Sequence, residues 1–139
     1  MYTELITEWA KENRWTEIQP GASEEDIARA EKAVGRAFPQ ELRELLLEMN
    51  GDRYLLFSTE EIIEDICTKR EYLLECYEDV EKHIFFAGNG CGDHYCYNIG
   101  PEGNADTSAI YIWEHETNET FPVANDIPEL IRRYYNSEI

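Results

Sequence analysis

The sequence has few basic residues. Its 12 Lys and Arg stand against 30 Asp and Glu, which gives a formal net charge of −18 at pH 7. Nucleic acids and anionic membrane surfaces are bound through Lys and Arg that neutralise phosphates, so this composition argues against both kinds of partner. It favours cationic partners, or simply a very soluble cytosolic protein.

Long apolar runs are also missing. The longest apolar runs are a few residues, such as Leu45–Leu47, whereas a membrane-spanning helix needs about 20. The chain starts without a basic segment and an apolar core, so we expect no secretory signal and a cytoplasmic location. In a reducing cytosol we expect free thiols rather than disulfides at the four cysteines, which are Cys67, Cys76, Cys91 and Cys96.

The remaining composition is that of a folded domain. Of the 139 residues, 42% are hydrophobic and 12% are aromatic, which is too rich for a disordered chain. We expect a single domain spanning residues 1–139, because chains of this length bury enough surface to fold without disulfides or metals.

Helix signals dominate the first half. Ser23 and Ser58 each precede an acidic residue by three positions, as N-caps do, and Gly35 suits the left-handed position that ends a helix. Pro39 opens a further helix, which Asn50-Gly51 ends. The Tyr- and Leu-rich segment 53–57 predicts a short strand.

Strand signals dominate the second half. Apolar or alternating segments predict strands, and Asp126 predicts the cap of a closing helix; the strands are Ile84–Ala87, His94–Ile99, Ala109–Trp113 and Thr120–Val123. Helices first and consecutive strands afterwards predict an α+β fold, with N-terminal helices packed on a central antiparallel β-sheet and a C-terminal helix.

Charge is distributed unevenly. Residues 83–131 contain no Lys or Arg and eight Asp and Glu, a local charge of −8. This is either a solvated surface or an acidic docking surface. Aromatic residues alternate on adjacent predicted strands in the same segment, and we expect one face of that sheet to be available to a partner; they are Tyr95, Tyr97, Tyr111 and Trp113.

One cluster contains metal-ligand residue types. Cys91, His94 and Cys96 would suit zinc, but the spacing matches no known zinc module and a fourth ligand is not evident. The alternative is a tight glycine-rich hairpin with small cysteines at its edge, and we favour it. A thiol nucleophile activated by a histidine is a further alternative, although no catalytic signature supports it. We therefore predict no cofactor and no enzyme activity.

The order of several motifs resembles the SUKH superfamily, the cell-wall-assembly-regulator type of domain that is widespread in bacteria. The resemblance spans roughly Ile18 to Tyr135 and rests on three blocks. They are Ile27-x-x-Ala30-Glu31-x-x-x-Gly35-x-x-Phe38-Pro39-x-x-Leu42 with Leu45-Leu46 and Asn50-Gly51; Ile84 through Gly88, Gly90, Gly92, Asp93 and Tyr95 to Asn98; and Ile110-Tyr111-x-Trp113-x-His115-Glu116 with Ala124-Asn125-Asp126. The charged stretch between Lys69 and Lys82 is longer than the resemblance leads us to expect.

The resemblance implies an α+β domain with an antiparallel sheet and a role in binding. Most bacterial members are immunity proteins that bind a cognate toxin domain, often a nuclease, whereas fungal relatives are regulatory interaction proteins. The resemblance implies no catalytic residues. We expect the partner, a basic toxin domain, to be contacted by the acids of the sheet half and the aromatics near them, namely Asp93, Tyr95, Tyr97, Tyr111, Trp113, Glu114, Glu116 and Glu119.

Overall fold

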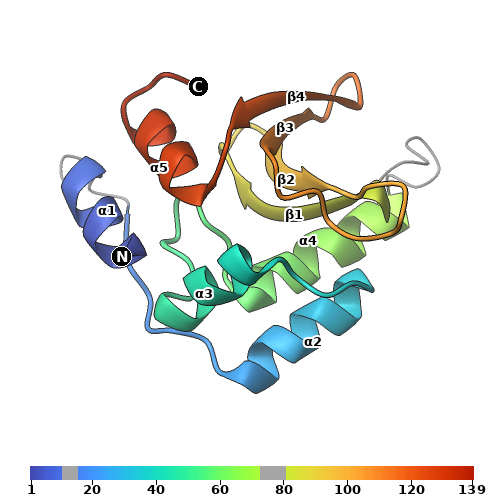
Figure 1. Cartoon of the computed structure of the whole chain (residues 1–139), viewed down its shortest axis with the longest axis horizontal. Helices are drawn as coiled ribbons and strands as arrows, with labels where there is room; N and C mark the ends of the chain where they lie inside the picture. The colour runs from blue at the N-terminus through green and yellow to red at the C-terminus, as the bar shows by residue number, and fades with distance from the viewer. Residues whose placement is uncertain (11–15, 73–80) are drawn as a thin grey trace.

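The computed structural model describes residues 1–10, 16–72 and 81–139. Within these ranges five helices and a four-stranded sheet form, with the helices mostly first and the strands afterwards (Figure 1). In chain order the elements are α1 (Tyr2–Trp9), α2 (Glu24–Val34), α3 (Gln40–Glu48), α4 (Thr59–Tyr72), β1 (His83–Gly88), β2 (His94–Asn98), β3 (Ile110–Glu114), β4 (Glu119–Ala124) and α5 (Ile127–Tyr135). This confirms the predicted α+β class. None of the described helices is long and apolar enough to cross a lipid bilayer.

The sheet has the strand order β1-β2-β3-β4, and every neighbouring pair is antiparallel. The outer edge of β1 is covered by residues 55–57. Phe57 donates its backbone N–H to Phe86 O at 3.0 Å, and Gly88 donates to Leu55 O at 2.9 Å. The strand at the other end of the sheet is β4.

The predicted helix caps are present. Ser23 and Asp26 form a reciprocal capping box at the start of α2, and Gly35 ends that helix with a φ of 87°. Ser58 and Glu61 form the same arrangement at the start of α4, with both N–H···O distances at 3.1 Å. These signals are readable from sequence because each cap involves only neighbouring residues.

The prediction of a strand over residues 53–57 is wrong. Only Leu56 forms a bridge, to Ala87, because the carboxylate of Asp52 accepts the backbone N–H groups of this segment. Asp52 is fully buried, and its second oxygen accepts the hydroxyl hydrogen of Tyr135. A residue that takes three consecutive amides pulls the chain into a turn rather than a strand.

Helices cover both faces of the sheet. On one face, Tyr97 donates its hydroxyl to Glu41 Oε1 of α3 at 2.7 Å, and the Tyr95 ring lies 6.2 Å from Tyr134 of α5. On the other face, α4 places the Lys69 ammonium over the ring of Phe85. Figure 1 shows α4 running beneath β1 and α5 beside the far end of β4. Strands β1 and β2 are therefore buried on both faces, whereas β4 is largely exposed.

Candidate functional site

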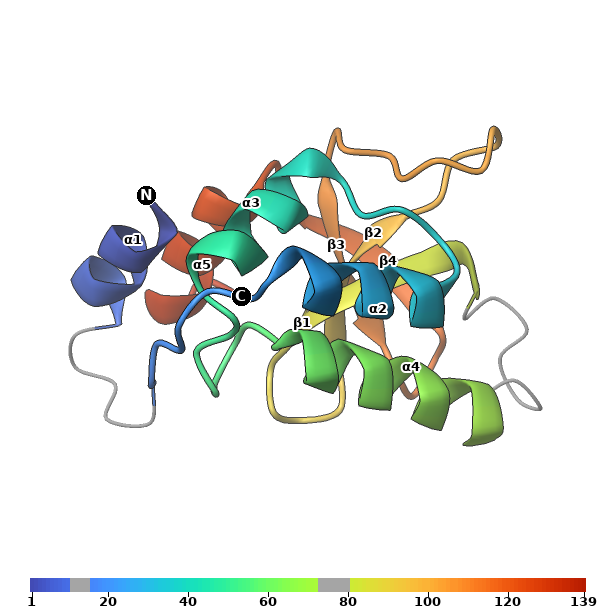
Figure 2. The same ribbon diagram turned by 90° about the horizontal axis from the view of Figure 1, so that it is seen from below.

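The predicted acidic residues lie at one end of the sheet. Strand β2 begins at His94, β3 ends at Glu114 and β4 begins at Glu119, so the turns that precede and join these strands are neighbours (Figure 2). We call this region the acidic end, and it comprises Asp93, Glu114, Glu116 and Glu119. The structure brings all four acids of the predicted set together.

Asp93 joins the two turns. Its Oδ1 atom accepts the backbone N–H of His115 at 3.1 Å and lies 2.7 Å from Nδ1 of the same imidazole. Burial opposes ionisation of this carboxyl, but its hydrogen bonds to His115 outweigh that effect and hold the pKa of Asp93 below its ordinary value. Asp93 is therefore an anion that fixes the position of the β3–β4 turn.

The β3–β4 turn is closed by internal hydrogen bonds. Asn118 donates its N–H to Glu114 O at 2.8 Å and accepts the indole N–H of Trp113 on its side chain at 2.7 Å. Asn118 adopts a φ of 57°, a conformation that asparagine tolerates better than most residues. These contacts hold the acids of the turn on a defined backbone.

The predicted aromatic contacts are placed differently. Tyr95, Tyr97 and Trp113 are each only 1% exposed, so the expectation that an open sheet face displays them is wrong for these three side chains. The strand register also puts Tyr95 and Trp113 on opposite faces, each covered by a helix. Tyr111 is half-buried at the surface and is the one member of the aromatic set that a docked protein could touch.

The cysteine and histidine cluster is dispersed. Cys91 is exposed in the turn, whereas Cys96 is fully buried, and burial raises the pKa of its thiol. His94 shares a sheet face with Cys96, but its Nδ1 atom lies 3.1 Å from the ammonium of Lys69. Within the described ranges no three His, Cys, Asp or Glu side chains are arranged to hold a metal ion. Cys76 lies outside the described residues.

A largely buried polar cluster joins α4 to the sheet. The Lys69 ammonium lies 2.6 and 2.7 Å from the two carboxylate oxygens of Asp65, and 4.5 Å from the centre of the Phe85 ring. His94 Nε2 lies 3.2 Å from the same carboxylate. Burial lowers the pKa of Lys69 and lowers the pKa of His94 to about 4, so the imidazole is neutral at pH 7. Every polar atom in this group has a partner, which is typical of a structural cluster.

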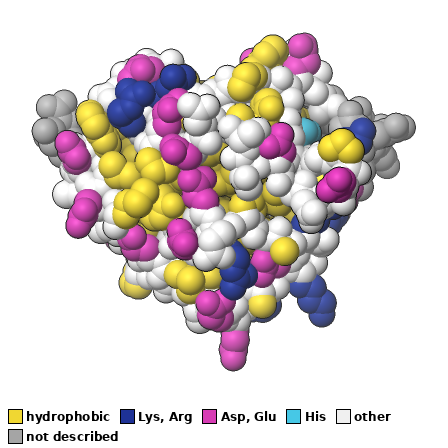
Figure 3. Space-filling view, viewed as in Figure 1, with side chains coloured by type: hydrophobic (Ala, Val, Ile, Leu, Met, Phe, Trp, Pro, Cys, Tyr) yellow, Lys and Arg dark blue, Asp and Glu magenta, His cyan; other side chains and the backbone are white. Residues whose placement is uncertain are grey.

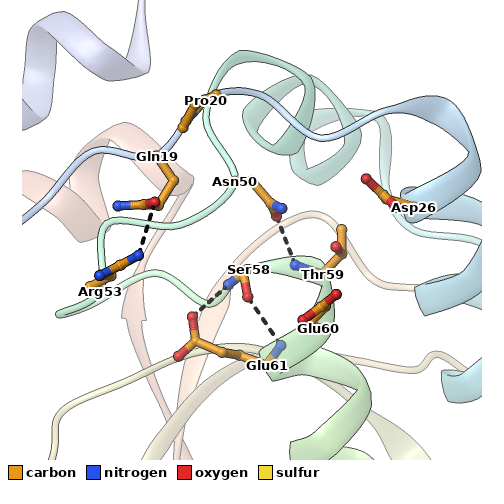
Figure 4. Close-up of a pocket in the computed structure, with 9 residues that line it drawn as sticks. All are labelled: Gln19, Pro20, Asp26, Asn50, Arg53, Ser58, Thr59, Glu60 and Glu61. Carbon is orange, nitrogen blue, oxygen red and sulfur yellow. Dashed lines mark hydrogen bonds between the residues drawn. The ribbon is translucent and has the colours of Figure 1, made fainter.

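An open polar pocket of about 250 Å³ lies between the start of α2 and the start of α4 (Figure 4). Its polar groups bond to one another, as when Asn50 accepts the N–H of Thr59 at 2.8 Å. The pocket is lined by Gln19, Pro20, Asp26, Asn50, Arg53, Ser58, Thr59, Glu60 and Glu61. These contacts cap helices and connect loops, and none of them points to a ligand.

Two residues that lie near the site were not identified from the sequence. Phe121 of β4 is 43% exposed and lies opposite Ile112, and the alternation Glu119-x-Phe121 on a strand was the available signal. Lys69 is 2% exposed, and no local signal indicates this, because its partners come from another turn of α4 and from β2.

The comparisons with known proteins point to one family. A search of curated proteins found no match to the chain. A model of the SMI1 / KNR4 family (SUKH-1) matches residues 21–133, which span α2 through most of α5. Membership of that family is consistent with a role in toxin immunity. Proteins of the family are generally immunity or regulatory proteins without catalytic activity. The chain belongs to the SMI1 / KNR4 family (SUKH-1).

Proposed function

We propose that this protein is an immunity protein that binds a bacterial toxin domain, with a nuclease as the expected class, and blocks it by forming a one-to-one complex in the cytoplasm. The observation that carries the proposal is the acidic end, in a half of the chain that has no Lys or Arg between residues 83 and 131. A nuclease binds phosphates through a basic groove, and an anionic surface of fixed shape is complementary to such a groove.

The net charge supports the same mechanism. At −18, the protein attracts a cationic partner over a distance comparable to the Debye length, which speeds association. Asp and Glu side chains are spread across the face seen in Figure 3, with apolar side chains exposed between them. A toxin acts catalytically from the moment it is free, so rapid capture has a direct benefit to the cell that makes it.

The test is co-expression with the toxin domains encoded by neighbouring genes. Restored growth, together with a one-to-one complex on size-exclusion chromatography, is the expected result. Growth arrest that persists at equal expression of folded protein refutes the proposal.

The electrostatic part has its own test. Changing Glu114, Glu116 and Glu119 together to Gln is expected to lower the association rate about tenfold at low salt and to flatten its salt dependence. Asp93 is left unchanged because it holds the turn. An association rate and salt slope equal to those of the wild type would remove the acidic end from the mechanism.

A further inference from the structure

Two cross-strand pairs lie side by side at the β3–β4 hairpin. Ile112 is opposite Phe121, and Glu114 is opposite Glu119. Alternate residues of a strand point to the same face, so all four side chains project from one face of the sheet. We call these residues the hairpin patch: Ile112, Glu114, Glu119 and Phe121. The patch combines an apolar half, in which Phe121 is 43% exposed, with an acidic half.

The acidic half is unfavourable in the free protein. Like charges directly opposite each other on neighbouring strands destabilise a sheet. Neither Glu114 nor Glu119 has a side-chain hydrogen bond or an ion pair in the described part of the chain, and the pair nearest to them in sequence joins His115 to Asp93 instead. A cation placed between the two carboxylates would relieve their repulsion. The fold therefore holds two anions together without supplying their counter-charge.

The apolar half continues beyond the hairpin. Ile112 is the register neighbour of Tyr95, whose ring contacts Tyr134 of α5, and Tyr134 in turn packs edge-on against Tyr54 at 5.6 Å. Tyr54 is 41% exposed. These contacts connect the hairpin patch to α5 through the core, because Tyr95 is only 1% exposed, and the exposed aromatic rings lie at the two ends, at Phe121 and Tyr54.

The exposed edge of β4 is unsuited to pairing with another strand. Pro122 has no N–H to donate, and Val123 is an extra residue opposite the Ile110–Tyr111 step, which breaks the register. Val123 O already accepts a hydrogen bond from Arg133 Nη1 at 3.0 Å. Recognition at this end of the sheet must therefore use side chains on the face rather than backbone groups on the edge.

A second copy of the chain is a poor occupant, because each copy carries a net charge of −18 and would oppose acids to acids. We infer that the hairpin patch anchors a cationic protein, which sets an Arg or Lys between the two glutamates and an apolar side chain against Phe121. The identification of this cationic protein as the toxin domain rests on the proposed function, whereas the binding mode at the patch does not. It assigns an exposed aromatic anchor in place of the buried ones that the sequence suggested.

The first experiment needs no toxin. A capped hexapeptide in which Arg and Leu alternate is titrated into isotope-labelled protein, and backbone and methyl NMR shifts are followed. The largest shifts are expected at Ile112 and Phe121. Phe121→Ser, or Glu114→Gln with Glu119→Gln, is expected to weaken binding about tenfold, which is the loss of one well-placed contact group.

Matched controls distinguish binding at the hairpin patch from non-specific attraction of the peptide to acidic or apolar side chains elsewhere on the surface. Leu47→Ser removes an apolar side chain that is 41% exposed on α3, and it is expected to leave the peptide affinity unchanged. Glu116→Gln removes one charge from the turn between the strands, and it should have a smaller effect than either Glu114→Gln or Glu119→Gln alone. Phe121→Leu keeps an apolar group, so it should retain most of the affinity if folding is intact.

The second experiment repeats the Phe121→Ser and Leu47→Ser variants against the inactivated toxin domain found by co-expression. Peptide shifts centred on another surface, or equal effects of the two variants, overturn the inference. If wild-type protein protects cells and Phe121→Ser binds the toxin equally well, the inference fails while the proposed function stands. If no toxin is neutralised, the proposed function fails and the peptide titration still decides the patch. Sedimentation tests the alternative occupant. If the wild-type protein is a dimer and Phe121→Ser makes it a monomer, the occupant of the patch is a second copy of the chain and the inference is overturned.

Discussion

Acid sensitivity should arise from one largely buried imidazole, that of His94. Burial lowers the pKa of His94 from 6.5 to about 4, against the opposing attraction of Asp65, and the Lys69 ammonium adds to the lowering. As the pH falls through 6.5 the unfolded chain takes up a proton on this ring, whereas the folded chain does so only near pH 4. Stability contributed by neutral His94 is therefore present above pH 6.5 and is lost as the pH falls towards 4.

The size of this loss follows from the two pKa values. Integrating proton uptake by the unfolded state gives a loss of about 2 kcal/mol between pH 7 and pH 5, and about 3 kcal/mol by pH 4. The first interval is the more informative, because carboxylates titrate mainly below it. A loss of this size is a large share of the 5–15 kcal/mol typical of a domain.

Urea unfolding at pH 7, 6 and 5 measures the effect. His94→Gln keeps a donor for Asp65 and an acceptor for Lys69 without a group that titrates in this range, so its free energy of unfolding should change by less than about 0.5 kcal/mol between pH 7 and pH 5. Ile27→Val serves as the control: it trims a fully buried side chain, costs about 1 kcal/mol, and should keep the wild-type pH dependence. If His94→Gln loses as much stability as the wild type over this interval, the reasoning is refuted.

Three other predictions concern contacts that hold the site in place. Lys69→Met should cost up to about 3 kcal/mol in urea unfolding, because it leaves the partly buried Asp65 carboxylate without its counter-charge, and adding Asp65→Leu should recover most of that loss. Glu48→Gln should cost about 1 kcal/mol and speed amide exchange in α1, since this carboxylate accepts the backbone N–H of Thr3 and a hydrogen bond from the terminal ammonium of Met1. Although burial opposes ionisation, those bonds lower the pKa of Glu48 to about 2, so the contribution is present above pH 4.5 and disappears as the pH falls towards 2. Gly92→Ala should displace the His115 ring, which lies 2.8 Å from the added Cβ position at a glycine with a φ of 101°, and NMR should then show the bond to Asp93 broken while α2 and α3 are unchanged.

The features that could be predicted from the sequence are local ones. The caps at Ser23, Ser58 and Asp126 were readable because each side chain accepts a backbone N–H from three residues further along. Gly35 was readable because a glycine adopts the left-handed conformation that ends a helix, here with its own N–H bonded to Glu31 O. The antiparallel sheet was readable because strands follow one another without intervening helices. The acids of the hairpin were readable because turns expose their side chains.

The features that could not be predicted depend on tertiary neighbours. Alternation along β2 shows that Tyr95 and Tyr97 share a face, but not that α3 and α5 cover it. Segment 53–57 has the composition of a strand, and only the buried carboxylate of Asp52 diverts it. Burial of Lys69 requires both an acid one turn away and an imidazole from β2, a combination that no sequence periodicity records.

The buried cluster and the acidic end are connected through one residue. Trp113 packs under the Lys69 ammonium at 5.3 Å, and its indole N–H closes the hairpin through Asn118. It immediately precedes Glu114, so the position of this acid is fixed by the core beneath it. A surface whose backbone is held before binding loses less conformational entropy in a complex, which lowers the cost of association. In the proposed complex, the polar cluster beneath β2 and β3 would therefore serve recognition indirectly, by fixing the backbone that carries Glu114.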